Sequence, residues 1–552
     1  MAAEKYYADL HCHASLIAYN INRNKFWDYD PPRERQRDNF LSTFFLSPFS
    51  QTEFSIMAKA GIKLAFISLY QVEQGFFDNL FLEPFGEKKK KGMIANKVLR
   101  EITDNPKFNE VRNAGARIVF NMPSSRYEEI DSDEFNYFDD INKEYKYITQ
   151  QIAQPQTVDG KQYRFFIPDN FHHLQQMLSL DADYNITNAS NGNIAIMLTI
   201  EGGHALGLGL KDLLLIADED LDSVDGNDVF TNPQVEALWQ KIKTNIALLK
   251  KWGSDTGNNH RPVFLTFTHH FWNQLCGHAM SFATMMHKGF NQQRGMTKGF
   301  TLLGEKVMDQ LLELNNPNSN TRILIDAKHL SIKARQTFYS KIKAHNNSTS
   351  GKKISVIASH TAVNQLATIS DVYAGKSHDE MDAIYDASGI FNPWDINLSD
   401  EEIINIYESG GLIGLIMDQR VLSGQKMINQ ISKIIKDQKL KADSLLYKSL
   451  WAEPLVQNLL HIVNTILKVH SSDTEKAWQV MSIGSDFDGM INPVDAFCFS
   501  EDFPTLRIII VEKLILRAPI EISLQGKSLI QIEQLVDGVM FKNAVRFLHQ
   551  NF

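Results

Sequence analysis

Cysteines, long apolar runs and an excess of positive charge are all scarce or missing in this sequence. Only three cysteines, Cys12, Cys276 and Cys498, occur among 552 residues. They are too few for a disulfide framework in a chain of this size, which favours a reducing compartment. No apolar run approaches the roughly 20 residues that a membrane-spanning helix needs. The first ten residues lack the pattern of a signal peptide, so we expect a cytoplasmic protein without a membrane partner.

Acidic residues outnumber basic ones. Lys plus Arg number 56 and Asp plus Glu number 65, which gives a formal charge of -9. Nucleic-acid binding requires clustered positive charge, and the one basic run, residues 88–91, is read as a solvated loop, so no nucleic-acid partner is expected. The chain is 43% hydrophobic and 22% charged, which excludes a collagen-like or wholly disordered protein and allows a large core.

Short apolar runs recur along the chain, with helical patterns between them. Most are near-continuous rather than alternating, which is typical of parallel strands covered on both faces. The eight strands that we predict span residues 6–11, 63–69, 194–200, 263–267, 322–327, 355–359, 412–416 and 480–485. A ninth candidate, 117–120, is assigned to an insertion. Eight strands alternating with helices predict the α/β class and a (β/α)8 TIM barrel, with an open doubly wound sheet as the alternative.

The whole chain is interpreted as a single barrel domain, residues 1–552, with long insertions. The clearest helices are predicted over residues 301–314 and 401–408. The intervals between strands that are too long for simple connections lie at about 71–190, 205–258, 361–398 and 422–476, the last of which has a helical pattern. These insertions are candidates for a lid or for a homodimer interface.

Side chains of the kinds that bind metals stand at the ends of five predicted strands. His11 and His13 end the first strand, and residues two apart project to the same face of a strand. The other four are Glu201, His329, His360 and Asp486. Because catalytic groups of such barrels sit at the C-terminal ends of the strands, the pattern predicts a metal site there.

These residues and the sequence around them resemble the amidohydrolase superfamily, and more closely the renal (membrane) dipeptidase family. The motifs that carry the resemblance lie at residues 9–13, 200–204, 265–269, 326–329, 359–362, 397–402, 409–411, 484–489 and 538–548. They span the barrel frame, and the insertions match nothing that we recognise.

The resemblance implies two divalent metal ions, with Zn²⁺ expected and Mn²⁺, Fe²⁺ or Ni²⁺ left open. His11, His13, Glu201 and Asp486 would serve the first ion, and Glu201, His329 and His360 the second. Such a pair would generate a bridging hydroxide at neutral pH that attacks the amide carbonyl of a dipeptide or an N-acyl amino acid. Asp486 would pass the proton to the leaving nitrogen, and His269 would face the oxyanion.

The sequence departs from the family in two places. The family usually has H-x-D at the first motif, and this chain has H-x-H at His11 and His13. The family also binds the substrate carboxylate through an Arg-Asn pair, where this chain has Ile396 and Asn397. Arg420 is a candidate to supply the missing charge, and a surface salt bridge is its alternative role.

The missing arginine leaves other readings open. The same metals could act on a lactone, an ester, a phosphoester or a cyclic amide. A binding protein without activity on a decayed barrel is a third reading, although all six ligand positions are filled. Two further histidines lie near the motifs. His204 is interpreted as a loop histidine, with a supporting position behind the metal ligands as the alternative, and His270 as a residue without a role.

Overall fold

Eight parallel strands follow one another around a barrel in their order along the chain. The protein is seen in a computed structural model that describes residues 5–21, 50–78, 122–188, 190–282, 292–316, 318–372 and 376–552. The barrel strands are β1 (Tyr7–Cys12), β2 (Ile62–Leu69), β5 (Asn193–Glu201), β6 (Phe264–Thr266), β7 (Leu324–Asp326), β8 (Ile357–Thr361), β9 (Leu412–Leu415) and β10 (Met481–Ile483). Each pairs in parallel with the next.

The last strand returns to the first. Beyond β10, the backbone N–H of Asp486 donates to the carbonyl oxygen of His11 over 2.9 Å. The N–H of His13 donates in turn to the carbonyl of Phe487 over 2.8 Å. The strands therefore form a nearly closed barrel, which confirms the predicted (β/α)8 architecture over an open sheet.

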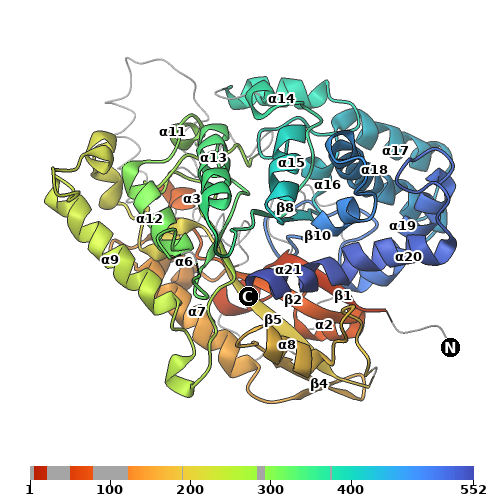
Figure 1. Ribbon diagram of the computed structural model, residues 1–552, viewed down its shortest axis with the longest axis horizontal. Helices are drawn as coiled ribbons and strands as arrows, with labels where there is room; N and C mark the ends of the chain where they lie inside the picture. The colour runs from red at the N-terminus through yellow and green to blue at the C-terminus, as the bar shows by residue number, and fades with distance from the viewer. Residues whose placement is uncertain are drawn as a thin grey trace.

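Helices surround the barrel. Those that follow barrel strands or pack outside them are α2 (Phe54–Ala60), α9 (Pro233–Leu249), α12 (Leu302–Leu312), α13 (Ile332–Ser348), α15 (Asp400–Glu408), α18 (Leu445–Val469), α19 (Phe503–Arg517), α20 (Leu529–Asp537) and α21 (Asn543–Asn551). In Figure 1, α9 and α12 lie on one side of the barrel and α17 (Gln425–Asp437) to α20 on the other. None of the helices in the described ranges is long and apolar enough to cross a membrane.

The two helices predicted most clearly form where the sequence signals place them. Thr301 caps α12, because its hydroxyl accepts a hydrogen bond from the N–H of Gly304 over 3.0 Å. Ser399 and Glu402 form a reciprocal capping box at the start of α15. The first of these helices ends at Leu312, two residues before the predicted end, because Glu313 takes a left-handed conformation with a φ of 50°.

The long intervals contain further elements. Their helices are α1 (Leu16–Asn20), α3 (Gly75–Asp78), α6 (Ser124–Asp131), α7 (Tyr137–Gln151), α8 (Phe171–Leu178), α11 (Gln293–Met296), α14 (His378–Asp386) and α16 (Gln419–Leu422). A hairpin of β3 (Gln156–Val158) and β4 (Lys161–Phe166) was not predicted, and β4 pairs in parallel with the start of β5. The candidate strand 117–120 lies outside the described residues. Both α17 and α18 lie within the interval 422–476, which was expected to be helical.

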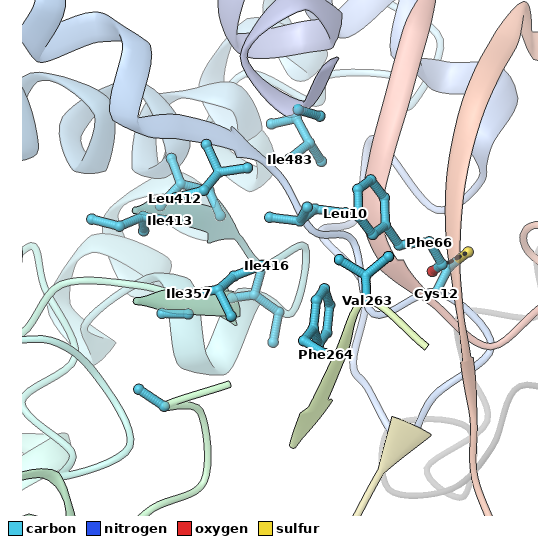
Figure 2. Close-up of a cluster of buried hydrophobic side chains, with 14 of the residues drawn as sticks. Leu10, Cys12, Phe66, Val263, Phe264, Ile357, Leu412, Ile413, Ile416 and Ile483 are labelled. Carbon is cyan, nitrogen blue, oxygen red and sulfur yellow. Dashed lines mark hydrogen bonds between the residues drawn. The ribbon is translucent and has the colours of Figure 1, made fainter. Parts of the chain in front are cut away.

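Apolar side chains from successive strands fill the barrel. Figure 2 shows Leu10, Phe66, Phe264 and Ile357 in one cluster, and each is fully buried. The rings of Phe66 and Phe264 lie nearly parallel with centroids 6.0 Å apart. Burying one such side chain contributes about 1.5 to 3 kcal/mol. With the barrel filled in this way, the polar side chains gather at the C-terminal ends of the strands.

Candidate metal centre

All six predicted ligands lie at the C-terminal mouth of the barrel. His11 and His13 stand at the end of β1, and Glu201 is the last residue of β5. His360 lies within β8, and His329 and Asp486 follow β7 and β10 by three residues. The backbone at His329 and Asp486 is left-handed, with φ of 65° and 62°. Left-handed backbone at a residue other than glycine costs about 1 to 3 kcal/mol, and such residues cluster at functional sites.

The carboxylate of Glu201 stands between two pairs of histidines. Its Oε2 lies 2.9 Å from Nε2 of His13, and the Nε2 atoms of His11 and His13 are 3.3 Å apart. Its Oε1 lies 3.6 Å from Nε2 of His329 and 3.5 Å from Nε2 of His360. The Nε2 atoms of His329 and His360 are also 3.3 Å apart. Two compact sets of ligand atoms therefore share Glu201.

Asp486 completes the cluster on the side of β1. Its Oδ1 lies 3.4 Å from Nε2 of His13 and 3.8 Å from Nε2 of His11. The side chain of Asp486 is 14% exposed, whereas those of His11, His13 and Glu201 are at most 2% exposed. Asp486 is thus the ligand candidate of this group that is open to the cavity above it.

One oxygen of Glu201 has no hydrogen-bond donor. Its Oε1 is buried and has no partner among the residues that the structure describes, although four imidazole Nε2 atoms lie 3.5 to 3.7 Å away. Leaving a carboxylate oxygen buried and unpaired is unfavourable by several kcal/mol. A cation between Oε1 and the rings would remove that cost, so these residues fit a bound metal ion.

The far sides of the His11, His13 and His360 rings are held so that Nε2 faces Glu201. The Nδ1–H of His13 donates to the carbonyl oxygen of Ser68 over 3.1 Å. The hydroxyl of Ser359 lies 3.1 Å from Nδ1 of His11 and 2.8 Å from Nδ1 of His360, and it donates to Asp326 over 2.5 Å. Such outer contacts fix the tautomer and orientation of histidine ligands.

The charges of the cluster favour a bound cation. Burial alone would raise the pKa of Glu201, but the imidazoles of His269, His11 and His13 hold it well below 4.5. Burial, followed by repulsion from neighbouring imidazoles, holds the pKa values of His329 and His360 well below 6.5. Ionised carboxylates and neutral imidazoles are the forms that bind metal ions. His13 differs from His329 and His360, because the carboxylates of Glu201 and Asp486 outweigh burial and raise its pKa to about 10, so it would release a proton when it binds a metal ion.

His269 is positioned by a residue that the sequence analysis missed. Its Nδ1 lies 2.8 Å from Oε2 of Glu73, and its Nε2 lies 3.7 Å from Oε1 of Glu201. Glu73 also accepts the N–H of Phe271 over 3.1 Å, so the carboxylate is fixed from two directions. Glu73 follows β2 by four residues, and the rule that polar groups at strand ends carry function could have found it.

The cavity above the cluster is lined by His269, Lys328, Trp394, Ile396 and Arg420, among others. Ile396 therefore stands in the wall of the cavity with no charge to offer. The side chain of Arg420 is only 19% exposed and pairs with Asp418 over 2.5 Å. The salt bridge expected as the alternative role of Arg420 is therefore present, but it lies in the wall of the cavity and not on the surface.

The two remaining histidines are both buried near the site. Nε2 of His204 donates to the carbonyl oxygen of Gln71 over 2.7 Å, and His204 belongs to none of the metal-type groups found in the described ranges. His270 lines the cavity, with its Nδ1 2.7 Å from the hydroxyl of Ser281. It also groups with His269 and His329, so it lies closer to the site than its sequence context indicated.

The similarity of this chain to known proteins is to solved structures. No family model and no curated protein matches the chain. Among solved structures, a metallopeptidase from Rhodobacter sphaeroides bound to a phosphinate mimic of the dipeptide L-Ala-D-Ala is 13% identical, with a TM-score of 0.45 and 100% of both chains covered. The dipeptidase AC is 13% identical with a TM-score of 0.44, covering 100% of this chain and 99% of that one. A probable dipeptidase from Pseudomonas aeruginosa is 13% identical with a TM-score of 0.43, covering 99% and 95%. Dipeptidases and metallopeptidases are thus among the solved proteins to which this chain is similar in outline.

Proposed function

We propose that the protein is a binuclear metal-dependent hydrolase that cleaves the amide bond of a dipeptide or an N-acyl amino acid. The observation that carries the proposal is the unpartnered Oε1 of Glu201, which stands between two histidine pairs among the described residues. A carboxylate in that place is suited to bridge two ions. The identity of the substrate rests on the motifs shared with the renal dipeptidase family.

The proposed ligands divide into two sets. His11, His13, Glu201 and Asp486 would hold one ion, and Glu201, His329 and His360 the other. The mixture of imidazole and carboxylate donors suits Zn²⁺. When bound, such ions supply Lewis acidity that activates water and polarises a carbonyl group.

The protein's own side chains supply the proton transfers. Asp486, which is open to the cavity, would hold the proton of the attacking water and deliver it to the leaving nitrogen. His269 lines the same cavity and would donate from Nε2 to the oxygen on which negative charge develops. Glu73 would keep that imidazole in place through the contact at Nδ1. Enclosure by apolar residues such as Ile396 would exclude bulk water.

A neutral ester, a lactone, a phosphoester or a cyclic amide is the second candidate class of substrate. The uncharged Ile396 in the cavity wall favours it, because the family's arginine is absent from that position. Hydrolysis assays on a panel of dipeptides, including D-residue C-termini, alongside these other substrates would separate the two classes. Turnover confined to the second class would contradict the amide proposal.

Replacing His360 with alanine tests the metal centre itself. We expect the variant to fold, to lose at least about half of its bound metal and to lose most of its activity, because the ligand lies near the end of β8, at the mouth of the barrel and outside its apolar core. The matched control is His172→Ala, which removes an exposed histidine that contacts Gln176. Metal content by elemental analysis and thermal melting are the measurements. A His360→Ala protein with unchanged metal content and activity would rule out the second ion.

A further inference from the structure

Lys328 is a buried cation in the cavity above the metal centre. It immediately precedes His329, it is 3% exposed, and it lines the cavity together with Glu201 and Asp486. Its ammonium group has no hydrogen-bond partner among the residues that the structure describes. A buried ammonium group without a hydrogen-bond partner is energetically unfavourable. A ligand of opposite charge would remove this cost.

The carboxylates that surround Lys328 are already engaged. Asp486, Asp326, Glu201 and Asp418 attract its charge electrostatically, yet none of the ion pairs found in the described part of the chain includes it. Asp326 accepts the hydroxyl protons of Thr266 and Ser359, over 2.9 and 2.5 Å. Lys328 is therefore not one half of a structural salt bridge within the described ranges.

The other groups of the cavity narrow the kind of ligand. Arg420 also lines it, but its guanidinium is bound by Asp418. The indole Nε1 of Trp394 is a second buried donor that lacks a partner among the described residues. Ile396 and Val421 add apolar walls. One cation and one neutral N–H beside apolar surface suit a carboxylate attached to an apolar group.

We infer that Lys328 binds a carboxylate of the substrate and thereby selects amides whose leaving half is a free amino acid. This inference rests on the proposed function and adds the residue that would recognise the free carboxylate of its substrates, and so separate them from amides, esters and lactones that lack the charge. It assigns the anion-binding role to a residue after β7, in place of the position that Ile396 occupies. Lys328 would be a positioning residue for the reacting bond.

The experiment compares two probes, a phosphinate analogue of alanyl-alanine with a free carboxylate and the same analogue as its C-terminal amide. Calorimetric titration of the metal-loaded protein gives both affinities. We expect the wild type to bind the acid at least about 10-fold more tightly than the amide, since hydrogen bonds to charged groups are worth roughly this much or more. Equal affinities, or no binding of either probe, would overturn the inference whatever a variant does.

Variants of Lys328 then test whether this residue causes the preference for the acid probe. Lys328→Met should weaken binding of the acid by roughly 10- to 100-fold and change binding of the amide little, and Lys328→Arg should recover part of the loss. Lys333→Met, at an exposed position on α13, is the matched control and should behave as the wild type. If Lys328→Met keeps the wild-type ratio of the affinities for the acid and the amide probe, Lys328 does not bind the carboxylate.

The two proposals fail in different ways. If the wild type binds the acid probe more tightly through Lys328 but hydrolyses no dipeptide, the carboxylate-binding role of Lys328 is supported and the proposed amide hydrolysis is contradicted. If dipeptides and their C-terminal amides are hydrolysed with the same KM, the proposed hydrolase activity is supported and the role of Lys328 is contradicted. In Lys328→Met the KM for a dipeptide should rise by the same factor as the acid affinity falls.

Discussion

Replacing Gly489 with alanine should disturb the metal centre without disturbing the barrel. Gly489 is buried beside the cavity, and its backbone is not in the left-handed region, so alanine is allowed there. A Cβ atom at this position would stand 2.4 Å from Oδ1 of Asp486 and 2.9 Å from its carbonyl oxygen. The methyl group would therefore collide with both the carboxylate and the backbone carbonyl of the proposed ligand.

The size of the effect follows from these distances. Ordinary van der Waals contact begins near 3.5 Å, so the carboxylate of Asp486 would have to move by about 1 Å. A misplacement of about 1 Å in a reacting group costs roughly 100-fold in rate. Overpacking of this kind destabilises a fold by only about 1 to 3 kcal/mol, which a domain of this size tolerates.

The assay compares kcat/KM on a dipeptide and the metal retained after dialysis against a chelator. Gly389→Ala is the matched control, because Gly389 is exposed and a Cβ there meets nothing within 4 Å. We expect Gly489→Ala to lose about 100-fold in kcat/KM and to retain less metal, and the control to lose neither. Full activity and full metal retention in Gly489→Ala would refute the role given to Asp486.

Two further predictions concern stability. Phe66→Ala should destabilise the protein by about 3 to 5 kcal/mol in urea unfolding, because it opens a cavity against Phe264 in the barrel core, and a cost below about 1 kcal/mol would contradict that packing. Burial raises the pKa of Glu144 from 4.5 to about 8, so the folded protein holds this proton more tightly than the unfolded chain, and stability should fall as the pH rises from about 4.5 to 8. Glu144→Gln should remove up to roughly 4 to 5 kcal/mol of this pH dependence. Melting curves of the wild type and the variant at pH 6 and pH 9 test this. An equal loss of stability between the two pH values in both proteins would contradict the role of Glu144.

The barrel was predictable because its strands are covered on both faces. Such strands are near-continuous apolar runs, and the predicted run 412–416 differs from β9 by one residue. By contrast, β4 begins with exposed polar residues at Lys161 and Gln162 and offers no such run. A strand that joins the sheet only beside the start of β5 carries too little buried sequence to be recognised.

The residues of the site were predictable by type and place, but not their mutual distances. The spacing of His11 and His13 puts them on one face, whereas their approach to Glu201 depends on the return of β10 to β1. Glu73 and Lys328 were not predicted. Glu73 follows a strand and could have been found by that position, but its contact with His269 shows only in space. Lys328 belongs to no sequence pattern that marks it, and its lack of a partner among the described residues is likewise visible only in the structure.

The hydroxyl of Ser359 has a consequence for how the centre would be filled. Because its one proton goes to Asp326, its oxygen is left to accept the Nδ1–H groups of both His11 and His360. These two rings belong to different halves of the proposed ion pair. Tilting one ring would strain the other through the shared oxygen, so the halves should load cooperatively, and their stepwise affinities should not behave as two independent constants.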